Sequence, residues 1–137
     1  MADLGFLHGV EVVSIEGAIR PIATQRSAII GLIGTAPEAD PEKFPLNKPV
    51  LVNTRGQSSA GIGATGTLPG ALKGIFEQFS PFVVVIRVEA DASAAVPLAN
   101  IIGGVNVSTG VRTGVSAFRD AQTEVCVTPM LLIAPGF

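Results

Sequence analysis

The residues that come nearest to a chemical motif are the glycines of GIGATG, residues Gly61–Gly66. Their G-x-G-x-x-G spacing is that of a dinucleotide-binding loop, in which backbone N–H groups at a helix N-terminus bind pyrophosphate. An apolar strand, Lys48–Arg55, precedes the loop, and a helix, Leu68–Phe79, follows it. A further apolar run, Pro81–Asp91, ends in acidic residues that could bind a ribose. The spacing therefore raises one hypothesis, a Rossmann-like nucleotide-binding domain of an oxidoreductase.

Two features of the surrounding sequence argue against that hypothesis. The strand ends at Asn53, well before Gly61, whereas the first glycine of the motif makes the tight turn directly off its strand. No Walker lysine follows either, because Gly66 runs into Thr-Leu-Pro. We therefore favour a loop that closes over the start of a helix, and we expect no cofactor.

The other residues that could do chemistry are few. His8 is the single histidine, Cys126 is the single cysteine, and neither tryptophan nor tyrosine is present. A Cys/His metal site needs more ligands than these two residues, and Cys126, flanked by valines, is expected to be an inert core thiol. Glu38, Asp40 and Glu42 lie in a proline-rich segment and are expected to be solvated. The sequence thus predicts no enzyme, no catalytic residue and no metal site.

Composition narrows the class of protein further. The chain has 137 residues, which fits one domain, and a net charge of −2, which argues against a nucleic-acid partner. No apolar run reaches the roughly 20 residues of a spanning helix, so we expect no membrane insertion. Charged residues make up 15% of the chain, against roughly a quarter in ordinary soluble domains. Either a Ser/Thr/Asn-rich surface replaces them, or other subunits or further chain cover much of the surface.

Four apolar segments are predicted to be strands. A continuous apolar run is typical of a strand that a sheet buries on both faces. Such runs occur at Ser27–Gly34, Val50–Asn53, Phe82–Val88 and Glu124–Phe137. Because helical patterns alternate with these runs, we expect an α/β fold, a mixed sheet with flanking helices and right-handed crossovers.

Three segments are predicted to be helical. The clearest is Leu68–Phe79, with Thr67 as its N-cap. Its apolar face has the spacing i, i+4, i+7, i+8 and i+11 and comprises Leu68, Leu72, Ile75, Phe76 and Phe79. Asp91–Ile102 and Thr109–Phe118 are the other two, each with a capping residue at its start. The segment Gly56–Thr67 is expected to be loop.

Residues 6–22 are predicted to be extended. Val10, Val12 and Ile15 alternate roughly with polar residues, and a glycine lies on each side of the run. Nothing beside this segment resembles a hairpin partner. Its backbone ladder must therefore be completed at long range or by another chain.

A series of short motifs runs through the chain in a recognisable order. They are His8-Gly9-Val10-Glu11-Val12, Gly17–Arg20, Ser27–Gly31, Ala36–Asp40, Phe44–Val52, Thr109–Phe118 and Thr128–Phe137. In this order they resemble the contractile-tail sheath proteins of bacteriophages and the related R-type tailocins. None of the motifs is diagnostic alone, but their order is, and they cover most of the chain.

The resemblance implies a structural subunit of a phage tail sheath. Sheath subunits of that family form hexameric rings around a tail tube, above a baseplate, and contraction drives tube penetration without nucleotide hydrolysis. Extended arms add strands to the sheet of a neighbouring subunit. Here residues 1–22 would be the extended N-terminal β arm, with partner-binding residues His8, Val10, Val12, Val13 and Ile15. The protein would be assembled in the host cytoplasm and reside in the virion tail.

Sheath proteins of this family are much longer than this chain. Residues 23–137 are therefore expected to be a partial α/β sheath domain, truncated at its C-terminus. A component of a type VI secretion sheath, a more distant relative of the same machine, is a further hypothesis. The nucleotide-binding domain stays open as the alternative outside the sheath family.

Overall fold

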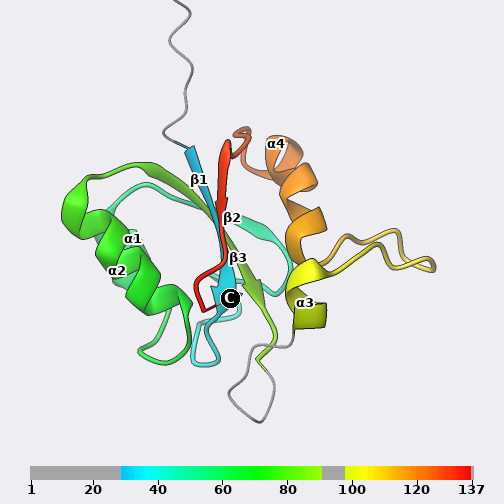
Figure 1. The fold of residues 1–137 in the computed structure, drawn as a ribbon, viewed down its shortest axis with the longest axis horizontal. Coiled ribbons are helices and arrows are strands. Elements are labelled where there is room, and N and C mark those ends of the chain that lie inside the picture. The colour runs from blue at the N-terminus through cyan, green and yellow to red at the C-terminus, as the bar shows by residue number, and fades with distance from the viewer. Residues whose placement is uncertain (1–28, 91–97, 137) are drawn as a thin grey trace, which may run out of the picture.

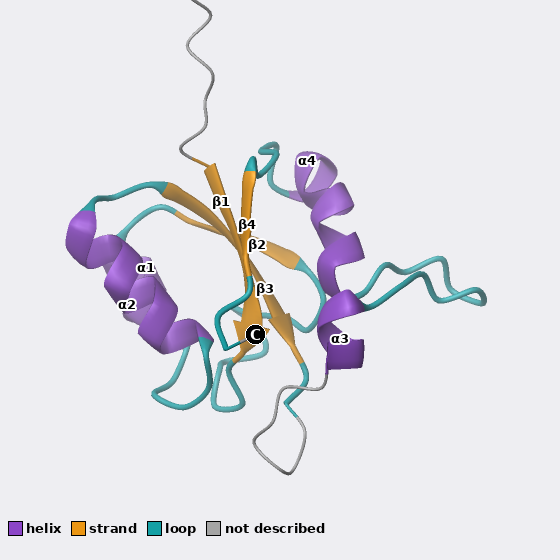
Figure 2. Ribbon diagram, viewed as in Figure 1, coloured by secondary structure: helices purple, strands orange, loops and turns teal. Residues whose placement is uncertain are grey.

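The computed structural model describes residues 29–90 and 98–136 of the chain. The predicted N-terminal arm, residues 1–22, and the expected helix cap Asp91 lie outside these residues. Within them, a mixed sheet of four strands has helices on both of its faces (Figures 1 and 2). This arrangement confirms the predicted α/β fold.

Two long parallel strands form the centre of the sheet. β1 (Ile29–Thr35) pairs with β3 (Phe82–Val88) along its whole length, from the Ile29–Phe82 pair to the Thr35–Val88 pair. β2 (Pro49–Val52) lies antiparallel to β3, and β4 (Leu131–Ile133) lies parallel to β1. The resulting order, β2-β3-β1-β4, makes β2 and β4 the two edge strands.

Two helical layers cover the sheet (Figure 2). One layer contains α1 (Arg55–Ser59) and α2 (Leu68–Gln78). The opposite layer contains α3 (Leu98–Ile102), the 3-10 helix η1 (Gly114–Asp120) and α4 (Ala121–Glu124). The α2 layer lies on the crossover from β1 to β3, and the η1 layer lies on the crossover that leads to β4.

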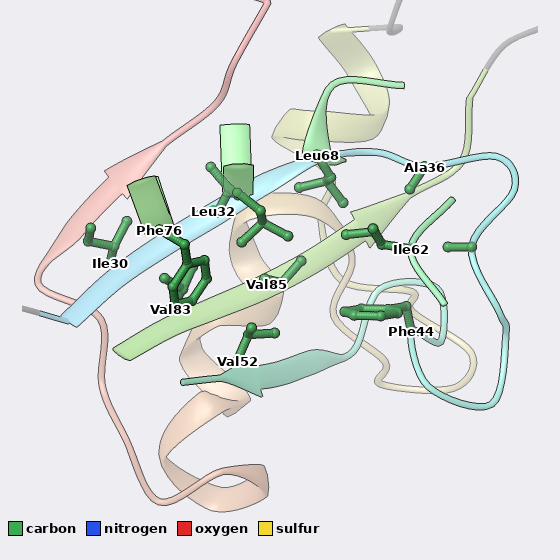
Figure 3. Packing of buried hydrophobic residues seen from close by; sticks show 12 residues of the cluster. Ile30, Leu32, Ala36, Phe44, Val52, Ile62, Leu68, Phe76, Val83 and Val85 are labelled. Carbon is green, nitrogen blue, oxygen red and sulfur yellow. The ribbon is translucent and has the colours of Figure 1, made fainter. Parts of the chain in front are cut away.

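Side chains of β1 and β3 alternate between the two faces, so each strand contributes to two cores. Toward α2, Leu32 and Val85 are fully buried among apolar side chains that include Leu68 and Phe76 (Figure 3). The opposite core holds Ile33, Val84, Ile86, Val88, Ile101, Ala117, Phe118 and Ala121. The two-sided apolar character of both strands is thus confirmed.

The helix predicted from Leu68 is confirmed with two corrections at its ends. Thr67 occupies the N-cap position, but its side chain makes no capping bond and instead accepts a hydrogen bond from the Thr35 N–H at 3.1 Å. Phe79, expected on the buried face, follows the last helical residue and is 54% exposed. The predicted loop 56–67 also contains most of α1, whose N-cap Thr54 accepts from the Gln57 N–H.

The helix predicted to start at Thr109 is wrong. Thr109 and Val111 lie in a hairpin closed by a bridge between residues 105 and 112, and helical structure begins only at Gly114, as a 3-10 helix. The Asn106 side chain accepts hydrogen bonds from the N–H groups of Ser108 and Thr109. Such local side-chain bonds stabilise a turn in competition with a helix.

The last predicted strand is shorter and more exposed than the sequence indicates. Only Leu131–Ile133 of segment 124–137 pair with β1. Leu131 and Leu132 are 51% and 50% exposed, because the described residues leave the faces of β4 largely uncovered. The expectation of a fully buried strand is therefore wrong for the residues that the structure describes.

Leu32→Ala is expected to lower the free energy of unfolding by about 2–5 kcal/mol, because the Leu32 side chain is fully buried at the centre of β1. Urea unfolding followed by circular dichroism measures the change. Leu132→Ala is the matched control and should cost less than half as much, since Leu132 is half exposed. An equal loss in the two variants would contradict the exposed position of β4.

Candidate functional site

The glycine loop 61–66 folds back onto the chain itself. The Ala64 N–H donates to a carboxylate oxygen of Glu38 at 3.1 Å. At the start of α2, the Thr67 N–H donates to the Thr35 carbonyl at 3.0 Å, and Pro69 in the first turn has no N–H to offer. Two backbone donors at the loop and helix start are thus engaged by the chain itself, and a third is missing.

Gly66 shows why this loop requires glycine. Its φ is +100°, in the region that side chains disfavour, and a Cβ at this position would collide with the carbonyl of Thr35. The close approach is therefore to the end of β1 and not to a ligand. This geometry supports the interpretation as a loop that closes over a helix start.

Cys126 does not lie in the core. It is exposed, with a φ of 57°, in the turn after α4. The prediction of a core thiol is wrong because the flanking valines mark a surface turn and not a strand. No cluster of three or more His, Cys, Asp or Glu side chains that could hold a metal occurs within residues 29–90 and 98–136.

The acidic loop after β1 is largely solvated, as expected. Glu38 and Glu42 are exposed, whereas Asp40 is half-buried and accepts a hydrogen bond from the Glu42 N–H. The Glu38 carboxylate stabilises the glycine loop through its hydrogen bond with the Ala64 N–H. Sequence reasoning missed this contact because its two partners lie far apart along the chain.

Two further polar residues, Arg87 and Asn47, went unnoticed in the sequence and hold loops at the end of the sheet. The Arg87 guanidinium donates to the carbonyls of Ala36 and Ala39, the latter at 2.7 Å. Asn47 donates through its N–H to the Arg87 carbonyl and accepts at its side chain from the Gly114 N–H at 3.1 Å. Asn47, with a φ of 54°, thus joins the β2–β3 side of the sheet to η1.

The surfaces that remain for binding a partner are edges and apolar patches. Both edge strands, β2 and β4, present a side without a neighbouring strand among the described residues. β4 adds half-exposed apolar side chains to its open edge. An open edge offers backbone N–H and C=O groups to an added strand.

Within residues 29–90 and 98–136, no helix has both the length and the apolar character needed to cross a bilayer.

Known proteins similar to this chain share one description. Residues 27–88 match the family described as tail sheath protein Gp18 domain III N-terminal region. The tail sheath protein of Escherichia phage P2 is 38% identical over 135 residues, which cover 94% of this chain. The chain belongs to the phage tail sheath protein family. This membership confirms the resemblance carried by the ordered sequence motifs.

Two other tail sheath proteins match the chain over nearly its whole length. The major tail sheath protein of Serratia phage KSP20 is 37% identical over 96% of the chain. A putative prophage major tail sheath protein of Pseudomonas aeruginosa is 32% identical over 97% of the chain. The chain spans about a third of the length of these relatives, 34% in each case.

Family membership decides the class of function. Tail sheath proteins are structural components of phages, so the prediction that the chain is no enzyme is confirmed by its relatives. The residues predicted to bind a partner lie outside the described residues, and their role stays a prediction: His8, Val10, Val12, Val13 and Ile15.

Gly66→Ala is expected to lower the free energy of unfolding by at least about 2 kcal/mol, because alanine is strained at this φ and its Cβ would collide with β1. Gly74→Ala is the matched control. Gly74 lies inside α2 with no atom within 4 Å of an added Cβ, so alanine should stabilise the helix by about 0.5–1 kcal/mol. Urea unfolding measures both changes, and a neutral Gly66→Ala variant would contradict the close packing of the loop.

Millimolar NAD or ATP is expected to leave the Tm of the chain unchanged, because Glu38 engages a donor of the glycine loop and Thr35 engages the donor at the start of α2. A ligand present at a hundredfold excess over its Kd would stabilise the fold by about 2.7 kcal/mol, which a thermal-shift assay detects. A rise in Tm that Gly66→Ala abolished would instead support the nucleotide hypothesis.

Proposed function

We propose that this chain is part of a structural subunit of a contractile phage tail sheath. The subunits polymerise in hexameric rings around the tail tube, above the baseplate, and their contraction drives the tube into the host. The observation that carries the proposal is the 38% identity to the tail sheath protein of Escherichia phage P2 over 94% of the chain. Assembly in the host cytoplasm and residence in the virion tail belong to the same proposal.

The proposed connection between subunits is strand addition. Residues 1–22 act as the arm, and residues 23–137 form part of the sheath domain to which the arm is attached. The outer edges of β2 and β4 have no neighbouring strand among the described residues. This supports the assignment, since a strand is added where backbone groups are unpaired. Backbone pairing supplies affinity, while the alternating side chains of Val10–Ile15 supply specificity.

In this proposal contraction needs no nucleotide. The energy comes from the difference between two packings of the same subunits, as in other bistable assemblies. Engaged donors in the glycine loop and family membership both support an energy source other than phosphate hydrolysis. The role of the described α/β unit is then to be a rigid body that moves while the arms hold neighbours together.

Negative-stain microscopy of the purified chain, with and without residues 1–20, tests the arm. Fibres, rings or tubes that form from the 137-residue chain and vanish on deletion would support the arm, because the arm supplies the strand that joins subunits. Val12→Pro is a smaller change with the same expected effect, since proline removes one ladder N–H.

Glu11→Ala is the matched control for Val12→Pro, because it keeps the backbone N–H at a neighbouring position of the arm. Assemblies should survive this change. Assemblies that also survive Val12→Pro and the deletion would contradict arm-mediated assembly. A chain that stays monomeric in every form would contradict self-assembly of this part of the sheath protein.

A further inference from the structure

β4 is a parallel strand whose outer side has no neighbouring strand within residues 29–90 and 98–136 (Figure 1, red). Its side chains Leu131, Leu132 and Ile133 are 51%, 50% and 36% exposed. Parallel strands occur almost only in sheets whose two faces are both covered. The described part of the chain therefore leaves β4 incompletely covered.

The pairing register shows that β4 presents apolar side chains to both faces of the sheet. Leu131 pairs with Ile30, which belongs to the core under α2. Leu132 pairs with Gly31 and points to the opposite face, where its side chain fills the space that a Cβ at Gly31 would need. Apolar residues on both faces are typical of a strand in the interior of a sheet.

β2, the strand at the opposite edge, has the features of a strand that ends a sheet. Pro49 is its first residue, and Lys48 directly precedes it. Lysine and proline are two of the means by which proteins protect an edge strand from pairing with other chains. Side chains of the same chain also lie beside β2, since Phe44, Gln57 and Ala60 contribute to the groove along it.

The edge formed by β4 lacks a protecting charge. No charged residue follows Glu124 in the sequence, and Met130, directly before β4, is 62% exposed. An uncharged apolar edge pairs readily with other chains and leads to aggregation. An edge that waits for another subunit must stay soluble until assembly, whereas an edge covered within its own subunit needs no such protection. The missing charge therefore favours a cover from the same polypeptide.

We propose that a further strand of the same sheath polypeptide, outside these 137 residues, pairs with the outer edge of β4. β4 is then an interior strand, and β2 is a true edge of the sheet. The inference rests on the proposed sheath function. It is supported by the relatives, because the matched part makes up only 34% of each and most of their length lies outside it. A segment of the same polypeptide also reaches this edge at high effective concentration.

The strand that fits this edge has a definable character. Its backbone pairs with the free N–H and C=O groups of β4, and its side chains are apolar on both faces because they extend the two cores. The predicted arm does not match this requirement, since Glu11 and Ser14 alternate with its valines. A neighbour's arm is thus left with β2 or with an edge that the further chain supplies.

Hydrogen exchange followed by mass spectrometry tests the proposal in two proteins. One is this 137-residue chain, and the other is the longer prophage protein of Pseudomonas aeruginosa, which matches 97% of the chain. The relative is measured as a monomer, as checked by sedimentation, and again after assembly. We expect the peptide containing Leu131–Ile133 to exchange rapidly in this chain. The aligned peptide of the monomeric relative should exchange at least about tenfold more slowly, after correction for intrinsic rates. The buried strand β3 is the internal control and should be slow in both proteins.

Each other outcome would overturn the proposal. Slow exchange of β4 in this chain would show that no further strand is needed. Slow exchange in the relative only after assembly would assign the strand to a neighbouring subunit, and rapid exchange in both of its states would leave β4 an edge. The sheath function would stand in these cases, because its own failure appears as the absence of ordered assemblies.

Leu131→Lys provides a second measurement. In this chain the position is half exposed, so lysine should leave the circular dichroism spectrum unchanged and lower the Tm by no more than about 5 °C. At the aligned position of the relative, lysine would be buried beside another strand and should cost several times more in Tm. Thr123→Lys, at an exposed position of α4, and its aligned counterpart are the matched controls. Equally small effects of both lysines in the relative would contradict an interior β4.

Discussion

Parallel pairing of β1 with β3 is the constraint on which the rest of the structure depends. Parallel strands cannot be joined by a tight turn, so the chain must cross a face of the sheet between them. Because both strands are apolar on both faces, each face also needs its own helical layer. α2 covers one face on the way to β3, and η1 covers the other on the way to β4. Within the described residues, the order β2-β3-β1-β4 then leaves the outer edges of β2 and β4 without a neighbouring strand.

The sequence alone predicts the elements whose apolar side chains are buried within the described sheet and its helices. β1, β3 and α2 could be predicted because continuous or helical apolar patterns coincide with the surfaces that the sheet buries. Segment 105–124 could not, since the side-chain bonds of Asn106 and the close crossing at Gly103 depend on local and tertiary geometry. β4 was misjudged for another reason: an apolar strand has the same sequence pattern whether its own chain or a partner covers it.

Prediction from sequence meets the same limit at the candidate site, the glycine loop 61–66. Its spacing is that of a phosphate loop, and only its distance from the preceding strand argued against this function. The structure supplies the physical reason, because the carboxylate of Glu38 binds a loop N–H that an anion would otherwise occupy. Glu38 and Ala64 belong to different loops, so no local pattern could connect them. Glycine is needed in this loop because the backbone of Gly66 passes close to the backbone at the end of β1.

The positions of the exposed apolar residues give a physical reason for the low content of charged residues. Most of them fall into two groups, one on α3 and the hairpin 105–112 that follows it and the other on β4 and the residue before it. Such groups favour aggregation unless further chain or a neighbouring subunit buries them. In the proposed assembly, an arm joined by backbone pairing can stay attached while subunits rotate. Contraction would need, besides this tether, side-chain contacts that differ between its two states.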